Sequence, residues 1–355
     1  MSMFRVALFV CTAAFVSLAF VWEAKSNSTA PKDELALGSL AEAEHAARER
    51  IQVVGAAAAY EEFAKAVETL PPIKQHAYAH VFGTALFAEE DLKGVTICDA
   101  RFSYGCYHDF LGRAIAAHGL GVARELNEAC MTSLASSSFN RLACQHGIGH
   151  GIMAHLGYDR DALDRALAEC RKFPYHGPVN GCYGGAIMEY DVQTILGDEA
   201  RMREINDAYD LCRSLPEEYK QECVFWQPQW WEQVLFGTKS SEEVSKQMGG
   251  YCKEISRGSA DLTRVCFEGI GSIILLAAEF DTRRAARLCD ATSERALERL
   301  LCRAFAANGL TTGNAGAKGN GEVICEGLSG EALAYCTAYA RNEANILEPR
   351  SPPFL

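Results

Sequence analysis

The sequence predicts an all-α protein, an α-solenoid or right-handed superhelix of about eight helix-pair repeats. Three observations predict it: the number of cysteines, their regular spacing, and the helical pattern of the stretches between them. The chain has 355 residues and 15 cysteines. Cys11 lies in an apolar N-terminal stretch, and the other 14 fall into seven successive pairs. The pairs are Cys98 and Cys106, Cys130 and Cys144, Cys170 and Cys182, Cys212 and Cys223, Cys252 and Cys266, Cys289 and Cys302, and Cys325 and Cys336.

The spacing of these pairs indicates repeats that are closed by disulfides. Successive first cysteines are 32 to 42 residues apart, which is the period of a two-helix repeat. An even number of cysteines in an exported chain indicates disulfides. Zinc or iron–sulfur ligation is the competing interpretation, but Cys-x-x-Cys does not occur. Each of the seven corners is therefore predicted to carry one disulfide, which would stabilise the fold by about 2–3 kcal/mol.

The stretches around the cysteines have helical patterns. Residues 161–170 and 242–252, which precede first cysteines, carry apolar residues at three-to-four spacing. Stretches after second cysteines, such as residues 144–153, are apolar and rich in glycine and alanine. We expect one helix to end at each first cysteine and a second helix to begin near its partner.

The N-terminal segment predicts the cellular compartment of the protein. Arg5 precedes the apolar residues 6–22, which is typical of a signal peptide or signal anchor over residues 1–23. The remainder is expected to be extracytoplasmic, in the periplasm or secreted, with only the N-terminal segment contacting a membrane. We expect a stalk or first helix over residues 24–50, the repeat domain over 51–347 and a disordered tail over 348–355.

Composition and motifs exclude several functions. The net charge of −12 argues against a nucleic-acid partner. The sequence contains no Gly-x-Ser-x-Gly, no phosphate loop, no His-Glu-x-x-His helix and no covalent haem motif. Serine-hydrolase, nucleotide and zinc-protease chemistry therefore have no support.

The repeats place most of the histidines at equivalent positions. The second helices can be aligned on their leading cysteine, or on Lys74 in a degenerate first repeat. Histidines then recur two and six residues further on. Residues four apart share a helix face, and equivalent positions of stacked helices point to the same side. Five histidines are thus expected to converge: His76, His80, His108, His146 and His150.

This convergence predicts a metal site, and two alternatives stay open. Imidazole-rich sites suit copper, zinc or iron. A histidine-lined pocket without metal and purely structural histidines are the alternatives. The other histidines are expected at the surface or at helix ends: His45, His118, His155 and His176.

Two carboxylates and two tryptophans complete the candidate site. Asp109 follows His108, and Glu189 lies after Cys182, so either is a candidate ligand or catalytic base. Trp226 and Trp230 are candidates for stacking on a bound cofactor or ligand. Pro228, between them, is expected to break or kink its helix and tilt the rings out of the stack.

In layout, the chain is similar to secreted cysteine-rich solenoids built from Sel1-like repeats, a resemblance that carries no functional residue. The sequence therefore predicts an exported metal-binding repeat protein, with catalysis at the metal as a further hypothesis. The groove would take a small molecule or peptide. The alternative is a non-enzymatic scaffold that binds a peptide or an envelope protein.

Overall fold

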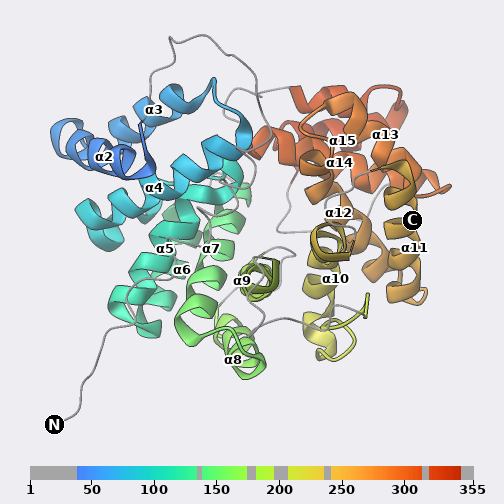
Figure 1. Ribbon diagram of the computed structural model, residues 1–355, viewed down its shortest axis with the longest axis horizontal. Helices are drawn as coiled ribbons and strands as arrows, with labels where there is room; N and C mark the ends of the chain where they lie inside the picture. Colours follow the sequence, from blue (N-terminus) through green and yellow to red (C-terminus); the bar gives the residue numbers. More distant parts are fainter. Residues whose placement is uncertain are drawn as a thin grey trace.

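The fold of the described part of the chain is entirely helical. The computed structural model describes residues 38–133, 138–173, 181–195, 207–235, 241–313 and 320–344 (Figure 1). Every regular element in these ranges is a helix, so the all-α prediction is confirmed. The predicted signal segment and C-terminal tail lie outside them. Among the described helices, none has the length and apolar character needed to span a membrane.

Seven helices form a central series in which each packs on the next along the chain. The central helices are α4 (Pro72–Glu90), α5 (Gly105–His118), α7 (Ser138–Leu156), α9 (Cys182–Ile195), α10 (Lys220–Trp230), α12 (Ala260–Ala277) and α14 (Ala296–Gly313). The flanking helices are α2 (Leu40–Val54), α3 (Ala56–Val67), α6 (Ala123–Ser133), α8 (Arg160–Cys170), α11 (Glu242–Ser256), α13 (Thr282–Ala291) and α15 (Gly330–Ala340). Short 3-10 helices lie at η1 (Asp91–Thr96), η2 (Phe102–Tyr104), η3 (Leu120–Val122), η5 (Glu217–Tyr219) and η7 (Asn320–Cys325).

The sequence explains why flanking and central helices differ. Several flanking helices begin at side-chain caps: in α8 Asp159 accepts from the amide of Ala162 at 2.7 Å, and in α13 Asp281 accepts from the amide of Arg284 at 2.7 Å. The helix α8 buries one stripe of apolar residues, as expected for a helix covered on one side. By contrast, α7 buries every residue from Leu142 to Met153, because other helices surround it.

All seven predicted disulfides are present, with Cα–Cα distances of 5.3 to 5.8 Å. They indicate an oxidising, extracytoplasmic environment. The expectation that a helix ends at every first cysteine is correct only at Cys170, the last residue of α8, and at Cys325, the last residue of the 3-10 helix η7. Elsewhere a first cysteine lies before the end of its helix, as Cys252 does in α11, or outside a helix, as Cys98 and Cys212 do. A position one turn from the helix end faces the neighbouring helix equally well, so the terminus itself is not required.

Helix α10 differs from the prediction at Pro228. The helix continues through Pro228 to Trp230 and then widens into a π-helical turn, η6 (Trp231–Leu235). Proline has no amide hydrogen to donate to the carbonyl four residues earlier, and the widened turn follows directly after it. Trp230 and Trp231 are fully buried there, so these two rings are packed in the core rather than tilted out of it.

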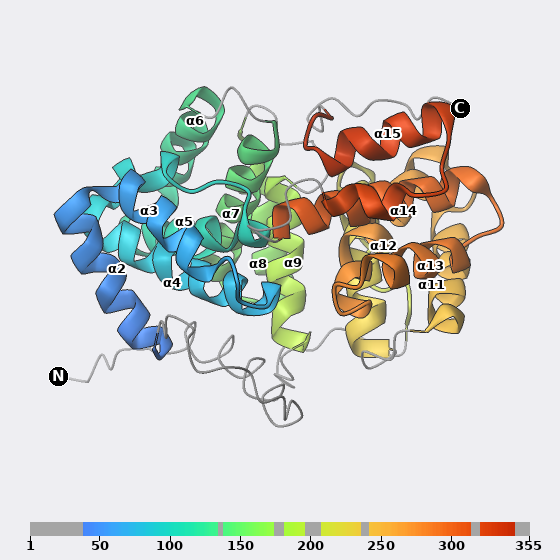
Figure 2. The same cartoon turned by 90° about the horizontal axis from the view of Figure 1, so that it is seen from above.

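The two ends of the helical series meet. The last central helix, α14, contacts η2 near the start of the series, and the Ser138 hydroxyl donates to the Ala344 carbonyl at 3.3 Å. Figure 2 shows α14 running from the C-terminal group of helices towards the N-terminal group. The stacking order is compatible with the predicted solenoid, but the chain curves until its last repeats contact its first.

Candidate metal centre

The five aligned histidines form one buried cluster on three neighbouring helices. Ring centroids of His76 and His80 on α4 are 4.6 Å apart, and those of His146 and His150 on α7 are 4.7 Å apart. His108 on α5 lies between these pairs, with its centroid 5.2 Å from His80 and 4.5 Å from His150. The predicted convergence is therefore present in the structure. Four of the rings are at most 9% exposed, and His76 is half-buried.

Glycines bring the supporting helices into backbone contact. A Cβ on Gly149 of α7 would overlap the carbonyl oxygen of Cys182, and a Cβ on Gly185 of α9 would overlap that of His146. Both obstacles are backbone atoms, which cannot move away as a flexible side chain can. The spacing of α7 and α9, and so the placement of Glu189 against His150, depends on these two glycines.

Gly185→Ala should therefore displace α9 from α7. Overpacking of this kind costs about 1–3 kcal/mol of unfolding free energy, and denaturant unfolding of the oxidised protein would measure it. The matched control is Gly250→Ala in α11, where a Cβ meets no atom within 4 Å. Equal stability of the two variants would contradict the packing argument.

The first histidine pair has both of its Nδ1 atoms on acceptors. His76 Nδ1 lies 2.6 Å from the Phe102 carbonyl oxygen, and His80 Nδ1 lies 2.9 Å from Asp109 Oδ1. Because a carbonyl and a carboxylate accept, both Nδ1 atoms donate, and a neutral ring then has its lone pair on Nε2. The two Nε2 atoms face each other at 3.0 Å. The other oxygen of Asp109 accepts from Thr84 at 2.9 Å.

The second pair shares the carboxylate contact and the facing Nε2 atoms. His150 Nδ1 lies 2.8 Å from Glu189 Oε2, and its Nε2 lies 2.9 Å from His146 Nε2. Tyr158 donates to the other oxygen of Glu189 at 2.8 Å. Each pair thus has one carboxylate behind its second histidine, and each carboxylate is held by one hydroxyl.

Burial favours the neutral, metal-binding form of three of the five histidines. Burial, together with the nearby His80, lowers the pKa of His76 and of His150 to about 3. Burial and then the charge of His150 lower the pKa of His108 well below its usual value. Neutral imidazole is the state that coordinates a metal ion.

The two carboxylates differ in their ionisation. Burial raises the pKa of Glu189 to about 7, against the opposing hydrogen bond from Tyr158. At Asp109, burial alone would raise the pKa, but the charge and hydrogen bond of His80 outweigh it and hold the pKa below the ordinary value.

The nitrogen positions fit metal coordination. Two groups of three histidines have ligand atoms within 4.8 Å of one another, and they share His108. Tetrahedral zinc with Zn–N bonds of about 2.05 Å places its nitrogens about 3.3 Å apart. The nearest nitrogens here are 2.9 to 3.4 Å apart. The 14 paired cysteines are all in disulfides, so they supply no thiolate ligand for a metal ion.

Three supporting groups were not predicted from the sequence: Thr84, Tyr158 and the carbonyl of Phe102. The sequence could have identified Thr84, because it lies one helical turn after His80 on α4 and so shares its helix face. The Phe102 carbonyl reaches His76 because η2 runs through left-handed backbone angles, with φ of 59° at Phe102 and 69° at Tyr104. Such angles are strained for residues other than glycine and often occur at functional sites.

Aromatic rings cover the second pair. Tyr104 lies edge-on to His146 at a centroid distance of 5.6 Å, and Trp226 lies 5.5 Å from the same ring. Trp226 therefore lies beside the cluster, whereas Trp230 is packed in the hydrophobic core. Among the remaining histidines, His45 and His155 are exposed and His118 binds Asp91 at the surface; His176 lies outside the described residues.

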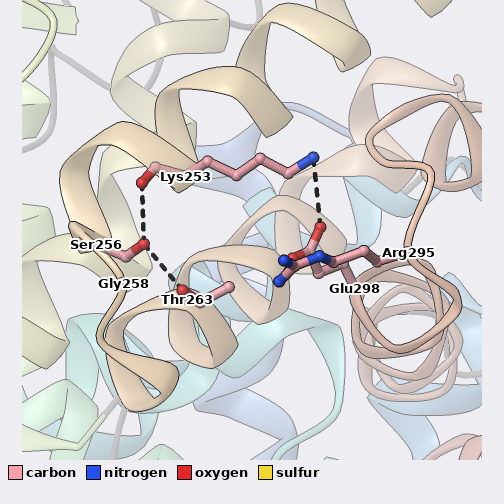
Figure 3. Close-up of a pocket in the computed structure, with 6 residues that line it drawn as sticks. All are labelled: Lys253, Ser256, Gly258, Thr263, Arg295 and Glu298. Carbon is pink, nitrogen blue, oxygen red and sulfur yellow. Dashed lines mark hydrogen bonds and ion pairs between the residues drawn. The ribbon is translucent and has the colours of Figure 1, made fainter.

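A separate cavity of about 270 Å³ lies among α11, α12 and the start of α14 (Figure 3). It contains no histidine, and its two cations are paired with one buried carboxylate. Glu298 lies 3.7 Å from Lys253 Nζ and 3.5 Å from Arg295. This cavity is therefore distinct from the histidine cluster and offers no metal ligand set.

Comparison with known proteins gives no assignment for the chain. No family model matches it, and no curated protein or solved structure is significantly similar to it. The geometry of the histidine cluster is therefore the basis for assigning a function.

Proposed function

We propose that the protein is an exported transition-metal-binding protein that holds its metal at the five-histidine cluster. The oxidising environment indicated by seven disulfides supports the export. The cluster supports the binding, because its imidazoles are mostly buried and directed at one another, and burial favours the neutral form of three of them.

A single observation carries the proposal. His76 and His80 each direct Nδ1 at an acceptor, so in the neutral rings two lone pairs face each other across 3.0 Å. Purely structural histidines would instead join an N–H to a lone pair. Metal-binding histidines nearly always donate their other ring N–H to a carboxylate or a backbone carbonyl. A cation between the two Nε2 atoms converts a repulsive contact into two bonds.

The type of ligand limits which metal ions the site can bind. Neutral imidazoles without thiolate suit copper, zinc or iron, and among divalent ions of the first row Cu²⁺ binds most tightly. We propose copper or zinc first and iron next. The ion would enter from the side of His76 and Asp109, which are half-buried, whereas His146 is 1% exposed.

The carboxylates support binding rather than hydrolysis. Both oxygens of Asp109 and both of Glu189 already hold hydrogen bonds, from His80 and Thr84 and from His150 and Tyr158 respectively. We therefore assign both carboxylates to orienting the histidines, in place of the base or ligand role that the sequence predicts.

Metal analysis of the purified, oxidised chain tests the proposal. We expect tight binding in titrations with Cu²⁺ or Zn²⁺, and a loss of affinity of more than about 100-fold when ligands from both pairs and the shared ring are removed. The test variant is His80→Ala, His108→Ala, His150→Ala.

A matched control replaces three histidines outside the cluster: His45→Ala, His118→Ala, His155→Ala. This variant should bind as the parent chain does. A parent chain that takes up none of copper, zinc and iron, or a test variant that binds as well as the control, would overturn the proposal.

A further inference from the structure

We infer that the cluster holds two metal ions at once and that His108 bridges them through both nitrogens of its ring. The inference rests on the proposed metal-binding function. It adds the number of ions, the bridging residue and the electronic coupling between the two ions.

The ligands divide into two sets that have one residue in common. One set is His76, His80 and His108, and the other is His108, His146 and His150. The first set uses His108 Nδ1, which lies 3.4 Å from His80 Nε2. Each set supplies three nitrogens, which is the number that a four-coordinate site with one open position requires.

The second nitrogen of His108 is the critical atom. His108 Nε2 is buried and has no hydrogen-bond partner in the described part of the chain, although the residue is only 9% exposed. Buried ring nitrogens are normally satisfied, so one without a partner requires an explanation. Nε2 and Nδ1 leave the ring at different edges. With Nδ1 near the α4 pair, Nε2 is the nitrogen that remains for the α7 pair, whose His150 ring centroid is 4.5 Å from that of His108.

The surrounding groups are also duplicated. Asp109, held by Thr84, lies behind His80, and Glu189, held by Tyr158, lies behind His150. Two carboxylates, one behind each pair, match two cations and offset part of their charge in a buried site.

The bridge has a defined proton balance. Neutral His108 carries one ring proton, and coordination at both nitrogens requires that this proton pass to the solvent. Two new metal–nitrogen bonds form, one N–H bond breaks, and no electron is transferred. Binding of the second ion therefore releases a proton that binding at the other, singly coordinated rings does not.

Copper titration with electron paramagnetic resonance tests the bridge on the full oxidised chain. We expect two Cu²⁺ per chain and a spin signal that accounts for well under half of the bound copper at low temperature, because an imidazolate bridge couples the two unpaired electrons. The paired variants His76→Ala, His80→Ala and His146→Ala, His150→Ala should each keep one ion, with full signal per copper.

Replacement of the bridge itself gives the second readout. His108→Gln should restore full signal per copper whatever its affinity, with circular dichroism checking its fold. One ion per chain, or two ions with full signal in the parent chain, would overturn the bridge while leaving metal binding intact. No binding of any ion would overturn both proposals.

Discussion

Glu189→Ala should weaken binding of the metal ion at the α7 histidines about 10- to 100-fold. The carboxylate fixes the ring of His150 and the tautomer that leaves Nε2 available. Its removal also leaves a buried N–H and the Tyr158 hydroxyl without their acceptor, which costs about 1–3 kcal/mol of unfolding free energy. Metal titration and denaturant unfolding of the same samples would measure the two effects.

Glu268 provides the matched control for this prediction. It is a buried glutamate at the position of α12 that corresponds to His146 in α7, and it pairs with Arg264 at 2.9 Å. Glu268→Ala should destabilise the fold, by about 3–5 kcal/mol for a broken buried pair, with unchanged metal affinity. If both variants lose metal affinity equally, the effect of Glu189 is general destabilisation and not orientation of His150.

Loss of the disulfide between Cys170 and Cys182 should destabilise the frame around the metal centre. The double variant Cys170→Ser, Cys182→Ser frees a loop of 12 residues and should cost about 2–4 kcal/mol. It also removes the covalent link between α8 and α9, so that α9, which carries Glu189, is held against α7 by packing alone. Thermal unfolding and metal titration would report both effects.

The disulfide between Cys252 and Cys266 is the control, because it closes a loop of 14 residues between α11 and α12, which carry none of the five histidines. Its removal should cost a similar free energy and leave the metal affinity unchanged. A count of free thiols in denaturant without reductant checks the premise. Several free thiols besides Cys11 in the parent chain would contradict the assigned pairing.

The frame was predictable because its determinants are local and repeated. Each disulfide joins residues 8 to 14 apart, so a regular spacing of cysteines is enough to pair them. The same spacing aligned His108 with His146 and so predicted their convergence. Both inferences use the repeat period alone and need no knowledge of side-chain orientation.

The supporting groups were not predictable because they depend on contacts between repeats. The Phe102 carbonyl reaches His76 only through a strained turn 26 residues later in the chain. Asp109 and Glu189 were identified as site residues, but their direction, behind the rings and held by hydroxyls, is set by helix packing. Pro228 misled the prediction because α10 continues through it to Trp230 and widens into a π-helical turn only afterwards.

The meeting of the two ends of the helical series has a consequence for unfolding. In an open stack of repeats, stability is a sum of nearest-neighbour terms, and terminal repeats fray independently. Here the hydrogen bond from Ser138 to Ala344 joins residues 206 positions apart, and α14 contacts the η2 turn that orients His76. The terminal repeats therefore cannot open alone. Loss of structure at the C-terminal end is transmitted to the first metal ligand, so the chain should unfold as one cooperative unit.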